Sequence, residues 1–377
     1  MVDTRNWFET LPHTRQRKLL ASQRDGLKIK VDGRSLLNFS SNDYLGLSVN
    51  PQVCAAVHDA VNQHGLGSGA SRLISGDDPL FHQFEQELAA WKGFESCLLV
   101  GSGMLANIGL MQTLADRFTH VFVDKLNHAS LLDGVRLSGA KHHRYPHADL
   151  GILTQLLQQN TDDKRIIVSD GIFSMDGDGA DVKELIQLAE DYDALLVVDD
   201  AHGTGTLGEA GKGLIADAGV AGHARLVEVG TLGKAFGSYG AYILGTEQMI
   251  EGLRQRMRTL IYSTALPVAV IAGAKEALDI IKTGALVHQL QEHVHYFLHH
   301  SKGLNVLPSI SPIQPIMLGS DANALRASAA LKEQGFFVPA IRPPTVAEGQ
   351  SRLRITLSAM HSQEEIKALT KVLVNCV

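Results

Sequence analysis

Six short apolar runs between residues 95 and 245 constrain the fold of this chain more than any other feature. They are CLLV (97–100), HVFVD (120–124), RIIVSD (165–170), ALLVVDD (194–200), LVEVG (226–230) and AYILG (241–245). Longer stretches with helical periodicity separate them. Strands that are apolar along their whole length and alternate with helices are typical of a mainly parallel sheet covered on both faces. The pattern therefore predicts an α/β fold whose functional residues lie at the carboxyl ends of the strands.

The regions on either side of these runs predict two further parts. We expect an N-terminal segment over residues 1–43, a large domain over 44–280 and a small C-terminal α+β domain over 281–377. A chain of 377 residues is long enough for more than one domain. The small domain is predicted from three short strands and a closing helix; the strands are PIQPIMLG (312–319), FFVPAIRPP (336–344) and RLRITLS (352–358).

Charge and composition exclude several classes of function. A net charge of -6 and a pI near 6.3 provide no general attraction for nucleic acid or an anionic membrane. No stretch is long and apolar enough to predict a transmembrane helix, and the first ten residues, MVDTRNWFET, do not resemble a signal peptide. The three cysteines, Cys54, Cys97 and Cys376, form no CxxC pair, which indicates a reducing compartment. We expect a cytoplasmic protein that binds small molecules.

Polar and glycine-rich segments follow five of the six apolar runs. They are GSGMLAN (101–107), KLNHAS (125–130), IFSMDGDG (172–179), AHGTG (201–205) and TLGKAFG (231–237). Because the carboxyl ends of parallel strands meet at one edge of a sheet, these segments are predicted to form one site. Gly101 and Gly103 precede a predicted helix, where backbone N–H groups can bind a phosphate.

Familiar nucleotide-binding motifs fit this site poorly. GTGTLG (203–208) satisfies GxGxxG and would suit a nicotinamide-dependent oxidoreductase, but no convincing ribose-binding acid follows about 20 residues later. Lys234 is not a P-loop lysine, because Glu228 and Ala235 stand where that motif requires Gly and Ser or Thr. A non-catalytic relative of the same fold is a third alternative.

The histidine-rich stretch HVHYFLHH (293–300) invites a metal interpretation. His295 and His299 lie one helical turn apart, but no cysteine or acidic third ligand is positioned with them. We expect a solvated helix face there and predict no metal site.

Asp199, His202 and Lys234 fit a different cofactor. A carboxylate at the end of a buried strand needs a cationic partner, and a protonated pyridine nitrogen would serve. Burial disfavours the charged form of a lysine, so Lys234 could act as a Schiff-base amine. An aldehyde-bearing pyridine with a phosphate group combines these needs, and the sequence predicts pyridoxal 5'-phosphate.

These motifs resemble those of a known family. VVDDAHGTGTLGEAGKG (197–213) and TLGKAFGSYGA (231–241) are similar to segments of the α-oxoamine synthases, pyridoxal-phosphate enzymes of the aspartate aminotransferase fold, fold type I. The likeness covers almost the whole chain in the family's order; its other segments are NFSSNDYLGL (38–47), GSGASRLISGD (67–77), DKLNHASLLDG (124–134), DGIFSMDGD (170–178), IYSTALP (261–267) and LRITLSAMH (353–361).

The resemblance implies roles for the catalytic residues. Lys234 would form the Schiff base with the cofactor, Asp199 would pair with its pyridine nitrogen, and His202 would donate a hydrogen bond to its phenolic oxygen. His128 would stack on the ring and also contact substrate. The remaining cofactor contacts implied are Gly103, Met104, Ser174 and Thr231.

The resemblance also implies the substrate contacts. Arg354 would pair with the carboxylate of the amino acid, as a bidentate guanidinium can. Thr345 would also contact substrate, and an arginine near the N-terminus, Arg15 or alternatively Arg17, would meet the acyl group.

AIRPPTV (340–346) is similar to the branch of the family that condenses L-alanine with a pimeloyl thioester in biotin biosynthesis, releasing CO2 and the free thiol. The thiol carrier would be coenzyme A or an acyl carrier protein, and the alternative activity is that of glycine C-acetyltransferase or another α-oxoamine synthase. Met104 and Ala347 depart from the pattern, where an aromatic residue and a proline are common. The likeness of IYSTALP implies a homodimer with shared active sites.

Overall fold

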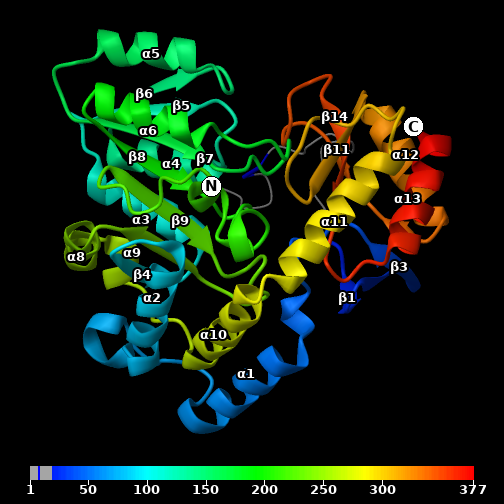
Figure 1. Ribbon diagram of the computed structural model, residues 1–377, viewed down its shortest axis with the longest axis horizontal. Coiled ribbons are helices and arrows are strands. Elements are labelled where there is room, and N and C mark those ends of the chain that lie inside the picture. The colour runs from blue at the N-terminus through cyan, green and yellow to red at the C-terminus, as the bar shows by residue number, and fades with distance from the viewer. Residues whose placement is uncertain (1–6, 9–18) are drawn as a thin grey trace.

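The computed structural model describes residues 7–8 and 19–377, and a seven-stranded sheet dominates it (Figure 1). The strands lie in the order β4 (Ser96–Val100), β10 (Ala241–Gly245), β9 (Leu226–Thr231), β8 (Ala194–Asp199), β7 (Arg165–Asp170), β5 (His120–Asp124) and β6 (Lys141–Tyr145). β10 runs antiparallel to both its neighbours, and the other pairs are parallel. The predicted mainly parallel sheet is confirmed, and all six apolar runs are strands of it.

The seventh strand, β6, has no apolar run. Its sequence is KHHRY, and only Tyr145 is fully buried. β6 lies at the edge of the sheet, where its other side chains meet solvent. An edge strand of this kind carries no hydrophobic signal, which is why sequence patterns did not predict it.

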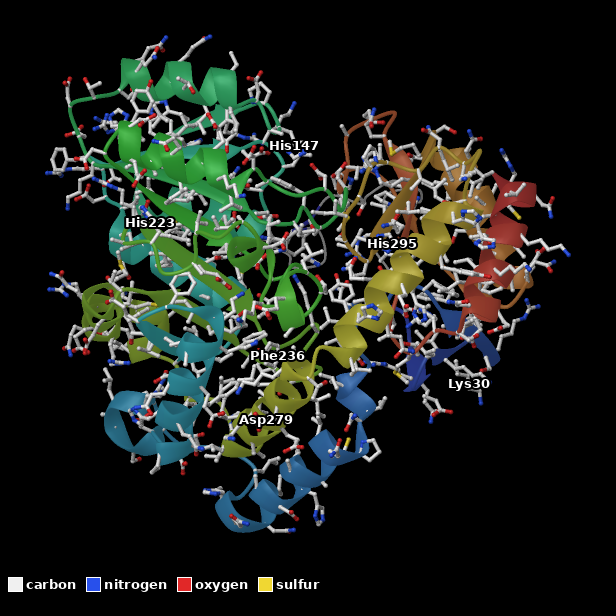
Figure 2. The ribbon with its side chains drawn as sticks, in the orientation of Figure 1. Lys30, His147, His223, Phe236, Asp279 and His295 are labelled. Atoms are coloured by element: carbon white, nitrogen blue, oxygen red, sulfur yellow. The ribbon has the colours of Figure 1, made fainter. Side chains whose placement is uncertain are left out.

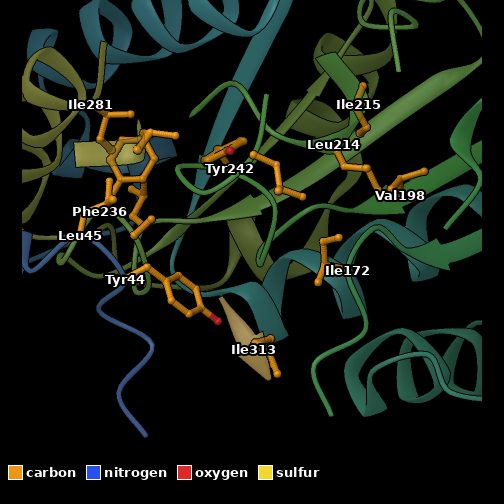
Figure 3. Packing of buried hydrophobic residues seen from close by; sticks show 14 of the residues in the cluster. Tyr44, Leu45, Ile172, Val198, Leu214, Ile215, Phe236, Tyr242, Ile281 and Ile313 are labelled. Atoms are coloured by element: carbon orange, nitrogen blue, oxygen red, sulfur yellow. The ribbon is translucent and has the colours of Figure 1, made fainter. Parts of the chain in front are cut away.

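Helices cover both faces of the large sheet. In β4, Leu98 and Val100 belong to one buried cluster, whereas Cys97 and Leu99 belong to the other, as the alternation along a strand requires. α3 (Gly103–Leu114), α4 (Ala129–Ser138), α8 (Glu247–Arg256) and α9 (Arg258–Ile261) contribute to the first cluster. α2 (Pro79–Lys92), α5 (Leu150–Gln159), α6 (Val182–Asp191), α7 (Leu214–Asp217) and α10 (Val268–Lys282) contribute to the second. Figure 3 shows part of the second cluster, including Phe236 and Tyr242.

Two small sheets stand beside the large one, at the right of Figure 1. One has the order β1 (Ser22–Asp25), β2 (Lys28–Val31), β3 (Arg34–Asn38), β12 (Phe336–Phe337), and the other has the order β11 (Ile313–Gly319), β14 (Ser351–Thr356), β13 (Ala340–Ile341). α11 (Ala285–His300), α12 (Asp321–Glu333) and α13 (Gln363–Cys376) pack with them. Because β3 pairs with β12, the N-terminal strands and the C-terminal region share a sheet. The domain bounds at 43/44 and 280/281 stay a prediction.

α1 (Pro51–His64) packs along α10, and α11 continues from α10 toward the small sheets (Figure 1). Three shorter helical turns complete the described elements: η3 (Leu47–Val49), η4 (Arg72–Gly76) and η5 (Glu209–Gly211). His295 lies on α11, the helix predicted from HVHYFLHH (Figure 2). None of the described helices has the length and apolar character needed to cross a membrane.

The segment that carries Lys234 is a loop between antiparallel strands, β9 and β10. Thr231 pairs with Ala241, Leu232 N–H donates to Gly240 O at 3.0 Å, and Ser238 N–H donates to Leu232 O at 2.9 Å. Gly237 has a φ of 64°, and a Cβ there would lie 2.1 Å from Ser48 N, so the loop requires glycine at this position. The backbone on both sides of Lys234 is therefore fixed.

Candidate active site

A cavity opens at the carboxyl edge of the large sheet. All eight residues predicted to contact the cofactor line it: Gly103, Met104, His128, Ser174, Asp199, His202, Thr231 and Lys234. Six of them lie at the last residue of the parallel strands β5, β7, β8 and β9 or within four residues after it, as the strand-end argument predicted. Asn107, Ser130, Asp170, Ile172 and Ala201 complete the lining.

Lys234 is the one amine in the lining of this cavity. Burial lowers its pKa to about 8, against the opposing attraction of the carboxylates of Asp199 and Asp170. An amine with this pKa is half neutral at about pH 8, far below the pH at which an ordinary lysine is, and a neutral amine is the nucleophilic form.

Asp199 ends β8 with its carboxylate held by two donors. Asn107 Nδ2 donates to Oδ2 at 2.7 Å, and Ala201 N–H donates to Oδ1 at 3.1 Å. No described cationic side chain lies within ion-pairing distance of it, although the carboxylate is half-buried. A carboxylate in this state fits a cationic N–H group of a bound ligand.

His128 caps the N-terminus of α4, where its Nδ1 lies 2.7 Å from Ser130 Oγ. Asn107 Nδ2 also donates to Ser130 Oγ, at 2.9 Å, so a chain of hydrogen bonds joins His128 to Asp199. Burial lowers the pKa of His128, which Asp199 opposes and Lys234 reinforces. The ring is therefore neutral near pH 7, the form suited to stacking on a pyridine.

His202 is buried, with 7% of its surface exposed, and its Nδ1 lies 2.6 Å from the hydroxyl oxygen of Tyr44. Burial, together with the positive charges of Lys234 and Arg354, lowers the pKa of His202 well below its ordinary value. The ring is neutral and holds one proton on one of its two nitrogens.

Two features of the cavity fit a phosphate group. α3 begins at Gly103, and the N–H groups of Gly103 and Met104 precede the first intrahelical hydrogen bonds at its N-terminus. Thr231 lies opposite as a second contact, but its hydroxyl already donates to Gly240 O at 3.0 Å. A phosphate held by Thr231 would have to take over that hydrogen bond.

Arg354 reaches the site from β14 and is 8% exposed. Its Nε donates to Ser174 O at 2.6 Å, and its two Nη atoms donate to Thr356 Oγ1 at 3.0 Å and Asn42 Oδ1 at 3.3 Å. These acceptors are neutral, and no carboxylate among the described residues forms an ion pair with it. A buried guanidinium without an anion is typical of a binding site for a carboxylate.

Arg354 contacts Ser174 but does not itself line the cavity, and of the predicted substrate contacts that the structure describes only His128 does. Thr345 is exposed in the loop between β13 and β14, where its N–H donates to Arg342 O at 3.0 Å. Arg15 and Arg17 lie outside the described residues.

Sequence reasoning missed four residues that hold the catalytic groups: Asn107, Ser130, Asp170 and Tyr44. Asp170 accepts the backbone N–H of His128 at 3.1 Å, and burial together with the charge of Asp199 raises its pKa well above the ordinary value. The motifs NHAS and SDG contain Ser130 and Asp170 and could have indicated them. Asn107 and Tyr44 lie in the segments GSGMLAN and NFSSNDYLGL, but neither segment indicates the partner that each residue contacts.

A histidine beside the cavity holds the loop that carries Ser174. His147 Nδ1 lies 3.1 Å from Asp124 Oδ1, and its Nε2 lies 2.8 Å from Asp178 Oδ2. These two carboxylates raise the pKa of His147 to about 10, so the ring is charged near neutrality. Figure 2 shows His147 on the side of the large sheet that faces the small sheets. The charged ring thus ties loop 171–180 to β5.

The GxGxxG segment at 203–208 is packed against protein. A Cβ at Gly203 would lie 2.0 Å from Asp200 Oδ1, and one at Gly205 would lie 2.4 Å from the Cβ of Ala235. These glycines permit close contact between loops, so this segment gives no support to a dinucleotide site.

Behind the cavity, three ionisable side chains are fully buried together. Lys92 Nζ lies 2.5 Å from Glu228 Oε1 and 3.7 Å from Asp200 Oδ2, and all three side chains have no exposed surface. Lys92 also donates to Thr204 Oγ1 at 3.0 Å and to the carbonyl oxygen of Lys212. We call Lys92, Asp200 and Glu228 the buried ionic cluster. It anchors the segment that follows Asp199.

Comparisons with known proteins identify the family of this chain. The model of the family described as Aminotransferase class I and II matches residues 34–373. An 8-amino-7-oxononanoate synthase from Saccharophagus degradans is 46% identical over 356 residues, which cover 92% of this chain and 89% of that protein.

Two solved structures superpose on most of the chain. A structure of SPT with PLP bound as an internal aldimine has a TM-score of 0.90 at 26% identity, covering 95% of this chain and 91% of that one. An 8-amino-7-oxononanoate synthase from Francisella tularensis has a TM-score of 0.79 at 30% identity, covering 90% and 97%. These superpositions confirm the predicted fold. The chain belongs to the aminotransferase class I and II family, among the 8-amino-7-oxononanoate synthases.

Proposed function

We propose that this chain binds pyridoxal phosphate and condenses L-alanine with a pimeloyl thioester to give 8-amino-7-oxononanoate, CO2 and the free thiol, a step of biotin biosynthesis. One observation carries the proposal: a single cavity joins a lysine of lowered pKa, an unpaired carboxylate and two neutral histidines. We infer the reaction itself from the relatives that are named 8-amino-7-oxononanoate synthase.

The side chains fit the cofactor one by one. Lys234 Nζ would hold the aldehyde carbon, and Asp199 would accept the pyridine N–H, for which it has a free lone pair. His128 would stack on the ring, and His202 would donate to the phenolic oxygen. The N-terminus of α3, with Ser174 and Thr231, takes the phosphate.

Bound pyridoxal phosphate supplies an electron sink for negative charge at the substrate carbon. Arg354 binds the carboxylate of alanine, exchanging its neutral acceptors for an anion. The amine of Lys234, whose pKa is lowered to about 8, would accept the proton of alanine Cα. Asp199 keeps its partner nitrogen protonated, because a buried carboxylate stabilises the positive charge beside it.

The experiment is an absorption spectrum followed by paired assays. The purified protein is expected to show a band near the violet edge that borohydride removes while fixing the cofactor to Lys234. Turnover with alanine and pimeloyl-CoA should exceed turnover with glycine and acetyl-CoA, the substrates of the alternative glycine C-acetyltransferase. A protein with no such band, or one that prefers glycine and acetyl-CoA, contradicts the proposal. Pimeloyl-coenzyme A and a pimeloyl carrier protein, compared as donors, identify the thiol carrier.

We also propose a homodimer with shared active sites. Leu66, Ile74 and Tyr262 are 82%, 81% and 72% exposed. The segments that carry them adjoin, because Ala265 N–H donates to Ala70 O and Ser68 Oγ bonds to Leu266 O. Large apolar side chains exposed together indicate a protein contact. Segment 261–267 does not line this chain's own cavity, which leaves it available to a neighbour's. Sedimentation velocity tests the dimer.

The cytoplasm is the compartment we propose, since Cys54, Cys97 and Cys376 are all free thiols.

A further inference from the structure

Tyr44 is a fully buried tyrosine that comes to the site from a distant part of the sequence. Its side chain has no exposed surface, and the segment that carries it follows β3. Figure 3 shows its hydroxyl pointing away from the packed side chains of Leu45 and Phe236. The hydroxyl oxygen lies 2.6 Å from His202 Nδ1, a short contact between two buried groups.

One proton lies between the hydroxyl oxygen of Tyr44 and His202 Nδ1. Which of the two atoms carries it decides whether His202 Nε2 is a hydrogen-bond donor or an acceptor. A neutral imidazole carries hydrogen on Nδ1 or on Nε2. If the hydroxyl of Tyr44 donates to Nδ1, Nε2 carries the hydrogen and is a donor. If Nδ1 donates to Tyr44, Nε2 is a bare acceptor. Nε2 has no hydrogen bond to another described residue, and the ring lines the cavity.

The surroundings of Tyr44 favour the first arrangement. The other acceptor within reach of its hydroxyl is Asn42 Oδ1, at 3.4 Å, and this oxygen already accepts a hydrogen bond from Arg354 Nη2. A hydroxyl gives its hydrogen to the closer acceptor, which is His202 Nδ1. Burial raises the pKa of Tyr44 to about 12, so the hydroxyl keeps its proton throughout the range in which the site works.

We propose that Tyr44 is a positioning residue that fixes His202 in the Nε2–H tautomer, so that His202 offers a hydrogen-bond donor to the cavity. This inference rests on the proposed function only for the acceptor, the phenolic oxygen of the cofactor. The tautomer itself is a property of the protein alone. It requires the hydroxyl of Tyr44, whereas the ring of Tyr44 serves packing.

The first test is 15N–1H NMR of histidine-labelled protein, freed of cofactor, with the His202 signals assigned from His202→Asn. We expect one tautomer, protonated at Nε2, in the parent protein and a mixture of both in Tyr44→Phe. Tyr242→Phe is the matched control: Tyr242 is equally buried, and its hydroxyl donates to Thr204 Oγ1 at 3.0 Å and not to His202. A pure Nε2–H signal in Tyr44→Phe, or an Nδ1–H signal in the parent, overturns the proposal.

The second test uses the holoenzyme and reads the pH midpoint of the cofactor's absorption change. Without a donor, the phenolic oxygen keeps more negative charge and holds the neighbouring proton more tightly, so Tyr44→Phe should raise the midpoint by about half a unit or more. His202→Asn should raise it too, and the double variant should shift no further, because both changes remove one interaction. Equal shifts in Tyr44→Phe and Tyr242→Phe, or additive shifts, refute the role of Tyr44. A protein that binds no cofactor instead refutes the proposed function, and the NMR result stands separately.

Discussion

Replacing Lys92 by methionine tests the energetic role of the buried ionic cluster. The substitution keeps the volume of the side chain and removes the cation that lies between Glu228 and Asp200. Two carboxylates without exposed surface then remain unpaired. Breaking a buried ion pair on one side costs about 3–5 kcal/mol, far more than the roughly 0–1 kcal/mol of an exposed pair. We expect the free energy of unfolding to fall by an amount in the larger range.

The loss should depend on pH in a defined direction. Burial raises the pKa of Glu228 to about 8 and that of Asp200 to about 6. A carboxyl whose pKa is raised by folding binds more protons in the folded than in the unfolded state, so its stability contribution is complete below the unfolded pKa and is lost as the pH rises through the folded value. Removing Lys92 raises both values further. The difference from the parent protein should therefore be larger at pH 8.5 than at pH 5.5.

The assay is urea unfolding of the holoenzyme, followed by far-ultraviolet circular dichroism at both pH values. Lys302→Met is the control, because Lys302 is exposed and the same change there should cost less than about 0.5 kcal/mol. The double variant Lys92→Met/Glu228→Gln should recover part of the loss, since it removes one of the two unpaired charges. If Lys92→Met lies within about 1 kcal/mol of the parent at pH 8.5, the cluster does not hold the charges assigned to it.

Four further outcomes follow from the site. Modification of Lys234 in the cofactor-free protein by an amine reagent, mapped by mass spectrometry, should rise with pH through about 8, since the amine becomes neutral there; a midpoint near 10 would contradict its burial. Arg354→Lys should raise the KM for alanine about 10- to 100-fold through loss of the bidentate contact, and an unchanged KM in initial-rate assays would exclude that contact. Asp199→Asn should retain the cofactor absorbance yet lower kcat at least about 100-fold; full activity would remove Asp199 from its role. His147→Gln should lower the denaturation midpoint most below pH 6.5 and progressively less toward pH 10, because the raised pKa of His147 stabilises the fold only while the ring is charged; a constant difference would refute this.

The sequence patterns predicted the strands that are buried in the large sheet, because burial requires apolar side chains. β5, β7, β8 and β9 are covered on both faces, so at least half of the residues in each are hydrophobic and the run is visible in the sequence. β1 and β6 are largely exposed, and nothing in their composition distinguishes them from loops. Packing context, which a local pattern does not contain, decides that these segments are strands.

The candidate site divides in the same way. Asp199, His202 and Lys234 were predictable because each follows a strand of the large sheet, so chain order alone brings them to one edge. Asn107 and Tyr44 reach their partners across 92 and 158 residues of sequence, from a helix and from the segment after β3. Their roles depend on hydrogen-bond geometry at those partners, which no spacing expresses. The same holds for the bonds of Arg354 to Ser174 and Asn42, which join the large sheet to the small ones.

The loop between β9 and β10 gives Lys234 an anchorage that the other catalytic residues lack. They lie at the ends of parallel strands that lead into helices or turns, whereas the loop of Lys234 is closed on both sides by the antiparallel pair Thr231 and Ala241. An amine that must leave one carbon atom and then take a proton from another has to travel. Because hydrogen bonds hold the backbone of the loop, this movement depends on rotation about the bonds of the four methylene groups in the Lys234 side chain. The reaction rate should therefore respond more to a change in the length of the side chain at position 234 than to a change in the flexibility of the loop.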